Sequence, residues 1–358
     1  MADTRQKTVV IADYDFGNAD IERAIIERAG LRMATAQCKS EDDVIAVARD
    51  ADAIIAQYAT VGAKAIGALT RCEVIARYGT GTDIVDVDAA TRRGILVTNV
   101  PNDWCESEVA DHAMALLLAA ARKICRYDQA TRAGAWWWQT GEPIHRISGR
   151  TLGLLSFGAI AQAISRRAAG FDMQVIASDP YMPATDITAR GALPVSLDEL
   201  LDQSDYLVIQ APLTAETHHL IDEPQLRRMK PTAILINTAR GPIVSDQALY
   251  RALSEGWIAG AGLDDIEEEP AKQRDWSPDN PLFSLDNVII TPHAAYYSEE
   301  AIRTVRDFAA SEVVRVLTGQ PPLSPVNAVQ VASIRRASAP RLKPCFRAER
   351  RCLRPFHG

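Results

Sequence analysis

Six short apolar runs recur between residues 151 and 293, and each ends beside polar or glycine-bearing residues. They read TLGLLSF, MQVIASD, YLVIQAP, AILINTA, IAGAGLD and NVIITPH, and helical stretches separate them. Buried strands that alternate with helices favour a parallel sheet covered by helices on both faces. The pattern therefore predicts one complete doubly wound α/β domain of six strands.

A second, shorter series comes first in the chain. TVVIADY, ADAIIAQ, CEVIARY and ILVTNV predict the strands of another doubly wound, flavodoxin-like domain. A chain of 358 residues is long enough for two such cores. The terminal helix SEEAIRTVRDFAASEVVRVLTG has a length that suits packing back on the first domain. We therefore predict a catalytic domain (1–100 with 294–334), a nucleotide domain (101–293) and a cleft between them.

The stretch LGLLSFGAIA, 152–161, has the context of a dinucleotide-binding turn, because a strand precedes it and the helix AIAQAISRRAAGF follows. Aligned on G-x-G-x-x-G, its three key positions are Ser156, Gly158 and Ala161. Gly158 keeps the place where pyrophosphate approaches bare backbone, and Ala161 is an accepted replacement. A left-handed backbone at Ser156 would cost on the order of 1 kcal/mol, which its hydroxyl could offset by hydrogen bonding. We predict a Rossmann-type domain.

Asp179 ends the next strand, 21 residues after Gly158. A carboxylate at this place suits the ribose 2′-hydroxyl and would repel a 2′-phosphate. The cofactor is therefore predicted to be NAD rather than NADP.

Three downstream segments, INTARGPIVSDQAL, AGLDDIEEEP and TPHAAYYSEE, place polar residues at the ends of strands where α/β sheets bind ligands. Here the sequence resembles the D-isomer-specific 2-hydroxyacid dehydrogenases, the family of D-3-phosphoglycerate dehydrogenase, D-lactate dehydrogenase and formate dehydrogenase. The resemblance covers roughly residues 8–327. TPHAAYYSEEA and ARYGTGTDIVD look most like the branch that contains the C-terminal-binding protein corepressors.

The resemblance implies a catalytic triad of Arg240, Glu269 and His293. Reduction of a 2-keto acid places negative charge on the carbonyl oxygen, and the imidazole of His293 could donate the proton. Glu269 would hold that imidazole in one tautomer, and Arg240 would grip the carboxylate through its planar fork. Glu267 and Glu268 are rivals of Glu269 by position, and the family pattern selects the Glu before Pro270.

The loop Tyr78–Gly81 ends a strand, and its N–H groups could cradle a carboxylate, although a plain tight turn would also explain the glycines. Predicted substrate contacts are Tyr58, Tyr78, Gly79, Thr80, Arg240 and Tyr296. Predicted cofactor contacts are Thr80, Ser156, Gly158, Ala159, Ile160, Asp179, Pro180, Gln210, Pro212, Thr217, Thr238, Ala239, Asp264 and His293. No metal is expected, and His218 and His219 are interpreted as surface residues near the adenine side.

The sequence departs from the family at three places. Asp265 and Ile266 follow Asp264 where the family usually has Val-Phe. Ile84 stands in the place of an Asn, and Ser156 in the place of a Gly.

Three features bear on partners. Trp136, Trp137 and Trp138 could form a substrate lid, pack the hinge between domains or cover a subunit interface. The helical run EVADHAMALLLAAARKICRYDQATRAG has an apolar face broad enough to lie between domains, and its many alanines suggest a homodimer. The tail 335–358 carries eight Lys or Arg and one acidic residue, and it is predicted to be a disordered appendage or an arm that docks on a neighbouring acidic subunit.

Composition sets the remaining expectations. The net charge of −7 disfavours nucleic acid as a partner. No stretch approaches a membrane span or a secretory signal, and the six cysteines are scattered, so we expect a cytoplasmic enzyme with reduced thiols. The predicted function is NAD-dependent interconversion of a 2-keto acid and a D-2-hydroxy acid. Alternatives are an NADH-sensing scaffold, similar to the corepressors, or a dehydrogenase of another small anion such as phosphite.

Overall fold

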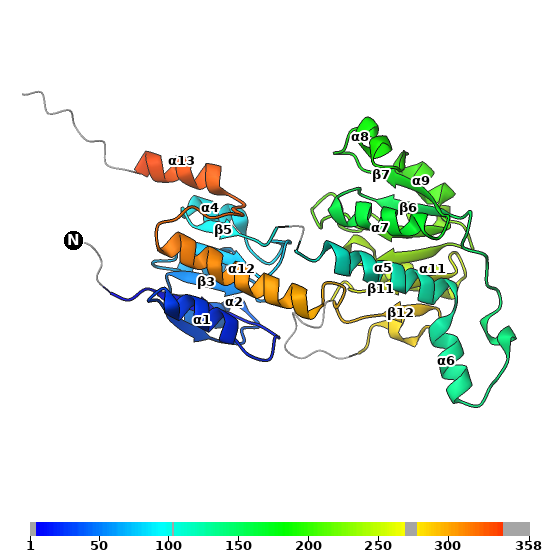
Figure 1. The fold of residues 1–358 in the computed structure, drawn as a ribbon, viewed down its shortest axis with the longest axis horizontal. Helices are drawn as coiled ribbons and strands as arrows, with labels where there is room; N and C mark the ends of the chain where they lie inside the picture. The colour runs from blue at the N-terminus through cyan, green and yellow to red at the C-terminus, as the bar shows by residue number, and fades with distance from the viewer. Residues whose placement is uncertain (1–4, 102–103, 269–277, 339–358) are drawn as a thin grey trace, which may run out of the picture.

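The computed structural model describes residues 5–101, 104–268 and 278–338. Within these residues the strands form two parallel sheets, each part of an α/β domain, and Figure 1 shows the two domains side by side. We call them the small-sheet domain and the large-sheet domain.

The small-sheet domain has the strand order β2-β1-β3-β4-β5, which is that of flavodoxin-like folds. Its strands are β1 (Thr8–Ile11), β2 (Arg32–Thr35), β3 (Ala53–Ala56), β4 (Val74–Arg77) and β5 (Leu96–Thr98). Its helices are α1 (Asp20–Arg28), α2 (Glu41–Ala48), α3 (Ala63–Ala68) and α4 (Val87–Arg92), joined late in the chain by α12 (Glu299–Leu317) and α13 (Ala328–Ser338).

The large-sheet domain has the order β12-β11-β10-β9-β6-β7-β8, the Rossmann arrangement with one further strand. Its strands are β6 (Thr151–Leu155), β7 (Gln174–Ser178), β8 (Leu193–Pro194), β9 (Tyr206–Ile209), β10 (Ile234–Asn237), β11 (Gly260–Leu263) and β12 (Val288–Ile290). Its α-helices are α5 (Glu106–Ala121), α6 (Ile124–Arg132), α7 (Ala159–Ala169), α8 (Ala184–Ala189), α9 (Leu197–Gln203), α10 (Glu223–Arg228) and α11 (Asp246–Ser254). Short 3-10 turns are η2 (Trp138–Gly141), η3 (Gly241–Ile243) and η5 (Pro281–Ser284).

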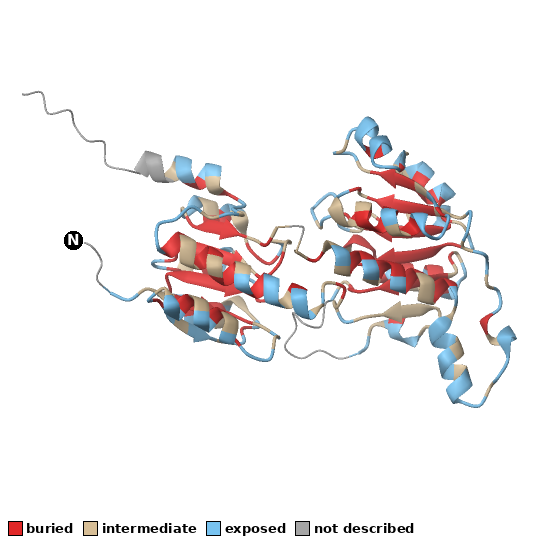
Figure 2. Cartoon of the chain, in the orientation of Figure 1, coloured by how far each residue is buried: buried red, intermediate tan, exposed pale blue. Residues whose placement is uncertain are grey.

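Both sheets have apolar clusters on their two faces, and Figure 2 shows this buried material between exposed helix faces. In the small-sheet domain, α1 and α12 cover one face of the sheet. Val305, Ala309 and Val313 of α12 are buried there. The prediction that the last long helix packs back on the first domain is thus confirmed, because α12 contacts α1, β3 and β4. These contacts support the predicted boundaries, 1–100 with 294–334 and 101–293, which we keep as a proposal.

Two predicted strand counts were wrong. β2 was missed because its four residues, RMAT, lie at the sheet edge and are mostly exposed, so they carry no apolar run. β8 was missed because it has only two residues. Edge strands of this kind leave little hydrophobic signal in a sequence.

The helical run after Pro101 was also predicted incorrectly as one helix. It breaks between α5 and α6, where Lys123 adopts φ 54°, a left-handed conformation that ends a helix. α5 packs mainly on α7, β10 and β11 of its own domain, and its N-terminal end also reaches the other domain, where Val109 clusters with Ala301 of α12. α6 has no buried residue and projects from the large-sheet domain (Figure 1).

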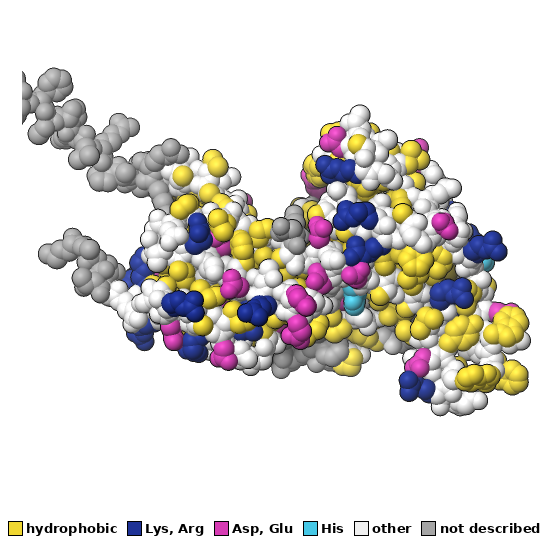
Figure 3. All heavy atoms as spheres, in the orientation of Figure 1, with side chains coloured by type: hydrophobic (Ala, Val, Ile, Leu, Met, Phe, Trp, Pro, Cys, Tyr) yellow, Lys and Arg dark blue, Asp and Glu magenta, His cyan; other side chains and the backbone are white. Residues whose placement is uncertain are grey.

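The tryptophans that follow α6 are not packed on a hinge. Trp136, Trp137 and Trp138 are 83%, 70% and 68% exposed, and they lie outside the lining of the cavity described below. The hinge and lid predictions were therefore wrong. Figure 3 shows hydrophobic side chains gathered on this projection, at the lower right.

Among the described residues, no helix combines the length and apolarity needed to cross a membrane. Residues 335–338, the start of the basic tail, belong to α13, and the rest of the tail lies outside the described residues. Both hypotheses for it stay predictions.

Candidate active site

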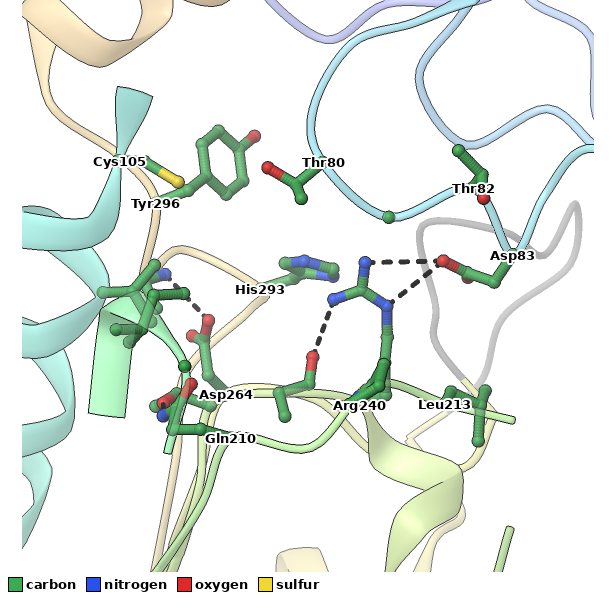
Figure 4. A pocket seen from close by; sticks show the side chains of 18 of the residues that line it. Thr80, Thr82, Asp83, Cys105, Gln210, Leu213, Arg240, Asp264, His293 and Tyr296 are labelled. Atoms are coloured by element: carbon green, nitrogen blue, oxygen red, sulfur yellow. Dashed lines mark hydrogen bonds and ion pairs between the residues drawn. The ribbon is translucent and has the colours of Figure 1, made fainter. Parts of the chain in front are cut away.

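A cavity of about 630 Å³ lies between the two domains. Residues that follow strands of both sheets line it, among them Tyr58 after β3, Thr80 after β4, Gly158 after β6, Arg240 after β10 and His293 after β12. In parallel sheets the carboxyl ends of all strands meet at one edge, and this is where α/β folds bind ligands. Figure 4 shows the cavity from close by.

The turn after β6 is open toward this cavity. Ser156 adopts φ 74°, the left-handed conformation that glycine takes in the usual fingerprint, and its hydroxyl donates to Asp179 Oδ2 at 3.2 Å. Phe157 N–H donates to the same oxygen at 2.8 Å. The serine thus keeps the shape of the turn at the cost of some backbone strain.

The beginning of α7 fits a dinucleotide pyrophosphate. Gly158 is the N-cap, no side chain caps the helix, and a Cβ built at Gly158 would meet no atom within 4 Å. Open space in front of bare backbone at a helix N-terminus is the arrangement that binds phosphate. Ala161 is fully buried where α7 meets the sheet, so its methyl group is accommodated.

Most predicted cofactor positions line the cavity, namely Thr80, Ser156, Gly158, Ala159, Ile160, Gln210, Pro212, Thr238, Ala239, Asp264 and His293. Asp179, Pro180 and Thr217 do not. Asp179 instead braces the turn, accepting also from Tyr181 N–H at 2.9 Å. The Thr217 hydroxyl donates to Pro212 O at 2.6 Å, which fixes the loop after β9.

Arg240 reaches across from the large-sheet domain to the small-sheet domain (Figure 4). Its Nε and Nη2 each lie 3.4 Å from Asp83 Oδ1, and its Nη1 donates to Ala239 O at 2.7 Å. The turn that carries it is held by Asn237, whose Nδ2 donates to Arg240 O at 2.8 Å. A Cβ at Gly81 would collide with Arg240 Nη2. The guanidinium is therefore aimed by contacts from both domains.

His293 sits on a strained turn with φ 52°. Asp264 holds this turn, because its backbone O accepts from His293 N–H at 2.8 Å, and its carboxylate accepts from Ala294 N–H at 2.9 Å and Ala295 N–H at 2.7 Å. Thr291 Oγ1 adds a further bond at 2.5 Å to Asp264 Oδ1. Asp264 was predicted as a cofactor contact, and it lines the cavity, yet both its carboxylate oxygens are engaged with the histidine turn.

Aromatic rings flank the imidazole. Its ring centroid lies 5.9 Å from that of Tyr58 and 6.0 Å from that of Tyr296, both edge-on. Gln57 Nε2 donates to the Tyr296 hydroxyl at 3.3 Å. Burial raises the pKa of Tyr296, so this hydroxyl stays protonated at neutral pH.

The loop Tyr78–Gly81 borders the cavity through Tyr78, Thr80 and Gly81, and some of its polar groups already have partners inside the small-sheet domain. The Tyr78 hydroxyl donates to buried Glu22 at 2.9 Å, and burial raises its pKa well above the ordinary value, so the phenol serves the domain interior. Gly79 does not line the cavity, and its N–H donates to Arg77 O at 3.0 Å. The substrate contacts of both Tyr78 and Gly79 stay predictions.

Glu269, the predicted partner of His293, lies outside the described residues. Its rivals are described. Glu267 pairs with His219 Nε2, and Glu268 is exposed.

Several lining residues were not predicted. Arg77, Asp83, Trp104 and Phe16 all border the cavity. The position of Arg77 at the carboxyl end of β4 was a usable signal, because strand ends collect ligand-binding groups. Asp83 and Trp104 gave none, because their role arises only where the two domains meet.

The fold and the cavity define a class: a two-domain α/β protein with a dinucleotide-type turn facing a cation and an imidazole across a cleft. Residues 114–295 match the family model described as D-isomer specific 2-hydroxyacid dehydrogenase, NAD binding domain. A glyoxylate reductase from Korarchaeum cryptofilum is 41% identical over 292 residues, which cover 80% of this chain and 86% of that protein.

Solved structures of this family are similar to this chain over most of its length. A glyoxylate reductase from Paecilomyes thermophila superposes with a TM-score of 0.80 at 28% identity, covering 91% of this chain and 99% of that one. D-lactate dehydrogenase from Aquifex aeolicus, complexed with NAD and lactic acid, superposes with a TM-score of 0.78 at 26% identity. The match covers 91% of this chain and 98% of that one. This chain belongs to the D-isomer-specific 2-hydroxyacid dehydrogenase family and is an oxidoreductase with an NAD-binding domain. These relatives give no support to the corepressor branch or to the hypothesis of a scaffold without turnover.

Proposed function

We propose that this protein reduces a small 2-keto acid to the 2-hydroxy acid with NADH, giving the D isomer where the product is chiral, and that glyoxylate is the first substrate to test. The observation that carries the proposal is the convergence of Arg240 and His293 on one cavity whose other end is the open turn at Gly158. The glyoxylate reductase and D-lactate dehydrogenase described above support the substrate class.

Each group has a defined task. The α7 N-terminus at Gly158 would hold the pyrophosphate, and Asp179, at the end of β7, would favour NAD over NADP. Bound NADH supplies the hydride. Arg240 binds the substrate carboxylate, and Asp83 keeps the guanidinium aimed into the cleft. His293 gives its proton to the carbonyl oxygen as charge develops there and takes it back in the reverse direction.

Steady-state oxidation of NADH with glyoxylate, pyruvate and hydroxypyruvate tests the proposal, with phosphite and NAD as a further arm. We expect turnover with at least one keto acid, and a loss of roughly 10²–10⁴-fold in His293→Ala. NADH binding by fluorescence should persist in that variant. Absence of turnover with every keto acid, or full activity of His293→Ala, would refute the proposed chemistry.

We also propose a cytoplasmic homodimer. The three exposed tryptophans beside α6 form an apolar surface of the kind that marks interfaces. The four cysteines among the described residues are free thiols, which suits a reducing compartment. Light scattering would show twice the chain mass, and a mass equal to one chain would contradict the dimer.

A further inference from the structure

Asp265 is a buried carboxylate next to the catalytic histidine that the mechanism above does not use. It follows Asp264 at the end of β11, and its side chain is 4% exposed. Its Oδ2 lies 4.0 Å from His293 Nδ1. The family usually has Val at this position, so the charge is a feature of this chain.

The same carboxylate is tied to the segment that carries Arg240. Asp265 Oδ2 accepts from Gly241 N–H at 3.3 Å, and Oδ1 accepts from Ile266 N–H at 2.9 Å. A Cβ at Gly241 would overlap the backbone of Ile266. The glycine thus permits the close approach that brings the carboxylate to both catalytic segments.

The groups around His293 come from several elements: Tyr58 after β3, Arg240 after β10, Asp264 and Asp265 after β11, and Tyr296 on the same turn. The carboxylate of Asp264 is engaged with backbone N–H groups of the turn rather than with the ring. Arg240 is a cation that opposes protonation of the imidazole, although it pairs with Asp83. Asp265 is the described carboxylate that faces the ring nitrogen Nδ1.

We propose that Asp265 is a positioning residue that couples the two catalytic segments and favours the protonated imidazole of His293. This inference rests on the proposed function and deepens it. A negative charge 4.0 Å away stabilises the imidazolium form. Because reduction of a keto acid consumes a proton from His293, Asp265 extends reductive activity to higher pH.

The test compares pH profiles of kcat/KM for glyoxylate reduction. Asp265→Asn removes the charge at constant size, and Asp265→Val installs the usual residue of the family. We expect the alkaline limb of the profile to move toward acid in both variants, because the charge that favours the imidazolium is gone. Asp286→Asn is the matched control, because it makes the same change at an exposed position of the same domain and should leave the limb in place.

A second readout does not depend on turnover. The Cε1–H resonance of His293, assigned by its absence in His293→Gln, is titrated by NMR in the wild-type chain and in Asp265→Asn, both without cofactor. A lower titration midpoint in the variant supports the proposal. Equal midpoints and equal limbs overturn it and leave Asp265 a purely structural residue. If no keto acid is reduced, the proposed function fails, and the NMR titration still decides this inference.

Discussion

Two glycine-bearing loops line the cavity from opposite domains, one after β6 and one after β4, and they differ in what lies in front of the glycine. The loop after β6 leaves open space in front of Gly158. The loop after β4 is filled by the protein itself: Arg240 presses on Gly81, Trp104 Nε1 donates to Thr80 Oγ1 at 3.1 Å, and Asn99 Nδ2 donates to Thr80 O at 2.7 Å.

A glycine in a loop therefore indicates that another group comes close to the backbone, but it does not indicate whether that group is a ligand or a side chain of the protein. At Gly158 the approaching group is expected to be a ligand phosphate. At Gly81 it is a side chain from the other domain. The first loop is therefore open to a ligand, whereas the second lines the same cavity and also supports Arg240.

Substitution of Gly81 should have the largest effect. In Gly81→Ala the new methyl group displaces the Arg240 guanidinium, so charge-assisted hydrogen bonds to the substrate are lost, worth about 1.5–3 kcal/mol. We expect kcat/KM for a keto acid to fall roughly 10- to 100-fold, while the Kd for NADH measured by fluorescence stays unchanged.

The control for this change is Gly67→Ala, at an exposed position inside α3 where a Cβ meets no atom within 4 Å. It should keep full activity, because alanine suits a helix interior. A Gly81→Ala enzyme with normal kcat/KM would show that Arg240 is aimed by other contacts.

Substitution of Gly158 should instead weaken the binding of NADH. In Gly158→Ala the chain without cofactor has room for the methyl group, so its Tm should match that of the wild type. The methyl group would occupy the place of the pyrophosphate, and we expect the Kd for NADH to rise about tenfold, or roughly 1.4 kcal/mol. A lowered Tm with unchanged affinity would remove the distinction between the two loops.

The smallest effect is expected at Ser156. Ser156→Gly relieves a left-handed backbone strain of about 1 kcal/mol and loses the 3.2 Å bond to Asp179, worth about the same. The free energy of unfolding, measured by thermal denaturation, should therefore change by less than about 1 kcal/mol. The affinity for NADH should be unchanged. A large destabilisation would mean that the hydroxyl, rather than the backbone shape, maintains the turn.

Much of the fold could be predicted from the sequence because buried parallel strands are apolar runs. The six runs after residue 150 became β6, β7, β9, β10, β11 and β12, and the glycine turn lies between β6 and α7 as predicted. The predictions failed at two places where the local sequence pattern did not reflect the final structure. Solvent-exposed β2 had no hydrophobic pattern, and a left-handed Lys123 broke a continuous helical period.

The site could be predicted in part for the same reason. Arg240, His293 and Gly158 follow strands, and parallel topology brings strand ends to one edge. The partners of the Tyr78 hydroxyl and of the Gly79 N–H could not be predicted in this way, because sequence position does not reveal whether such a group is already engaged inside its own domain.

By itself, the sequence determined the alternation of strands and helices, the dinucleotide turn and the family. Only the tertiary structure decided that Asp83 meets Arg240, that Asp265 faces His293 and that the tryptophans lie on the surface. The physical reason is distance along the chain. Periodicity and turn chemistry act over a few residues, whereas residues 265 and 293 meet only when β11 and β12 pair, and residues 83 and 240 only when the two domains meet.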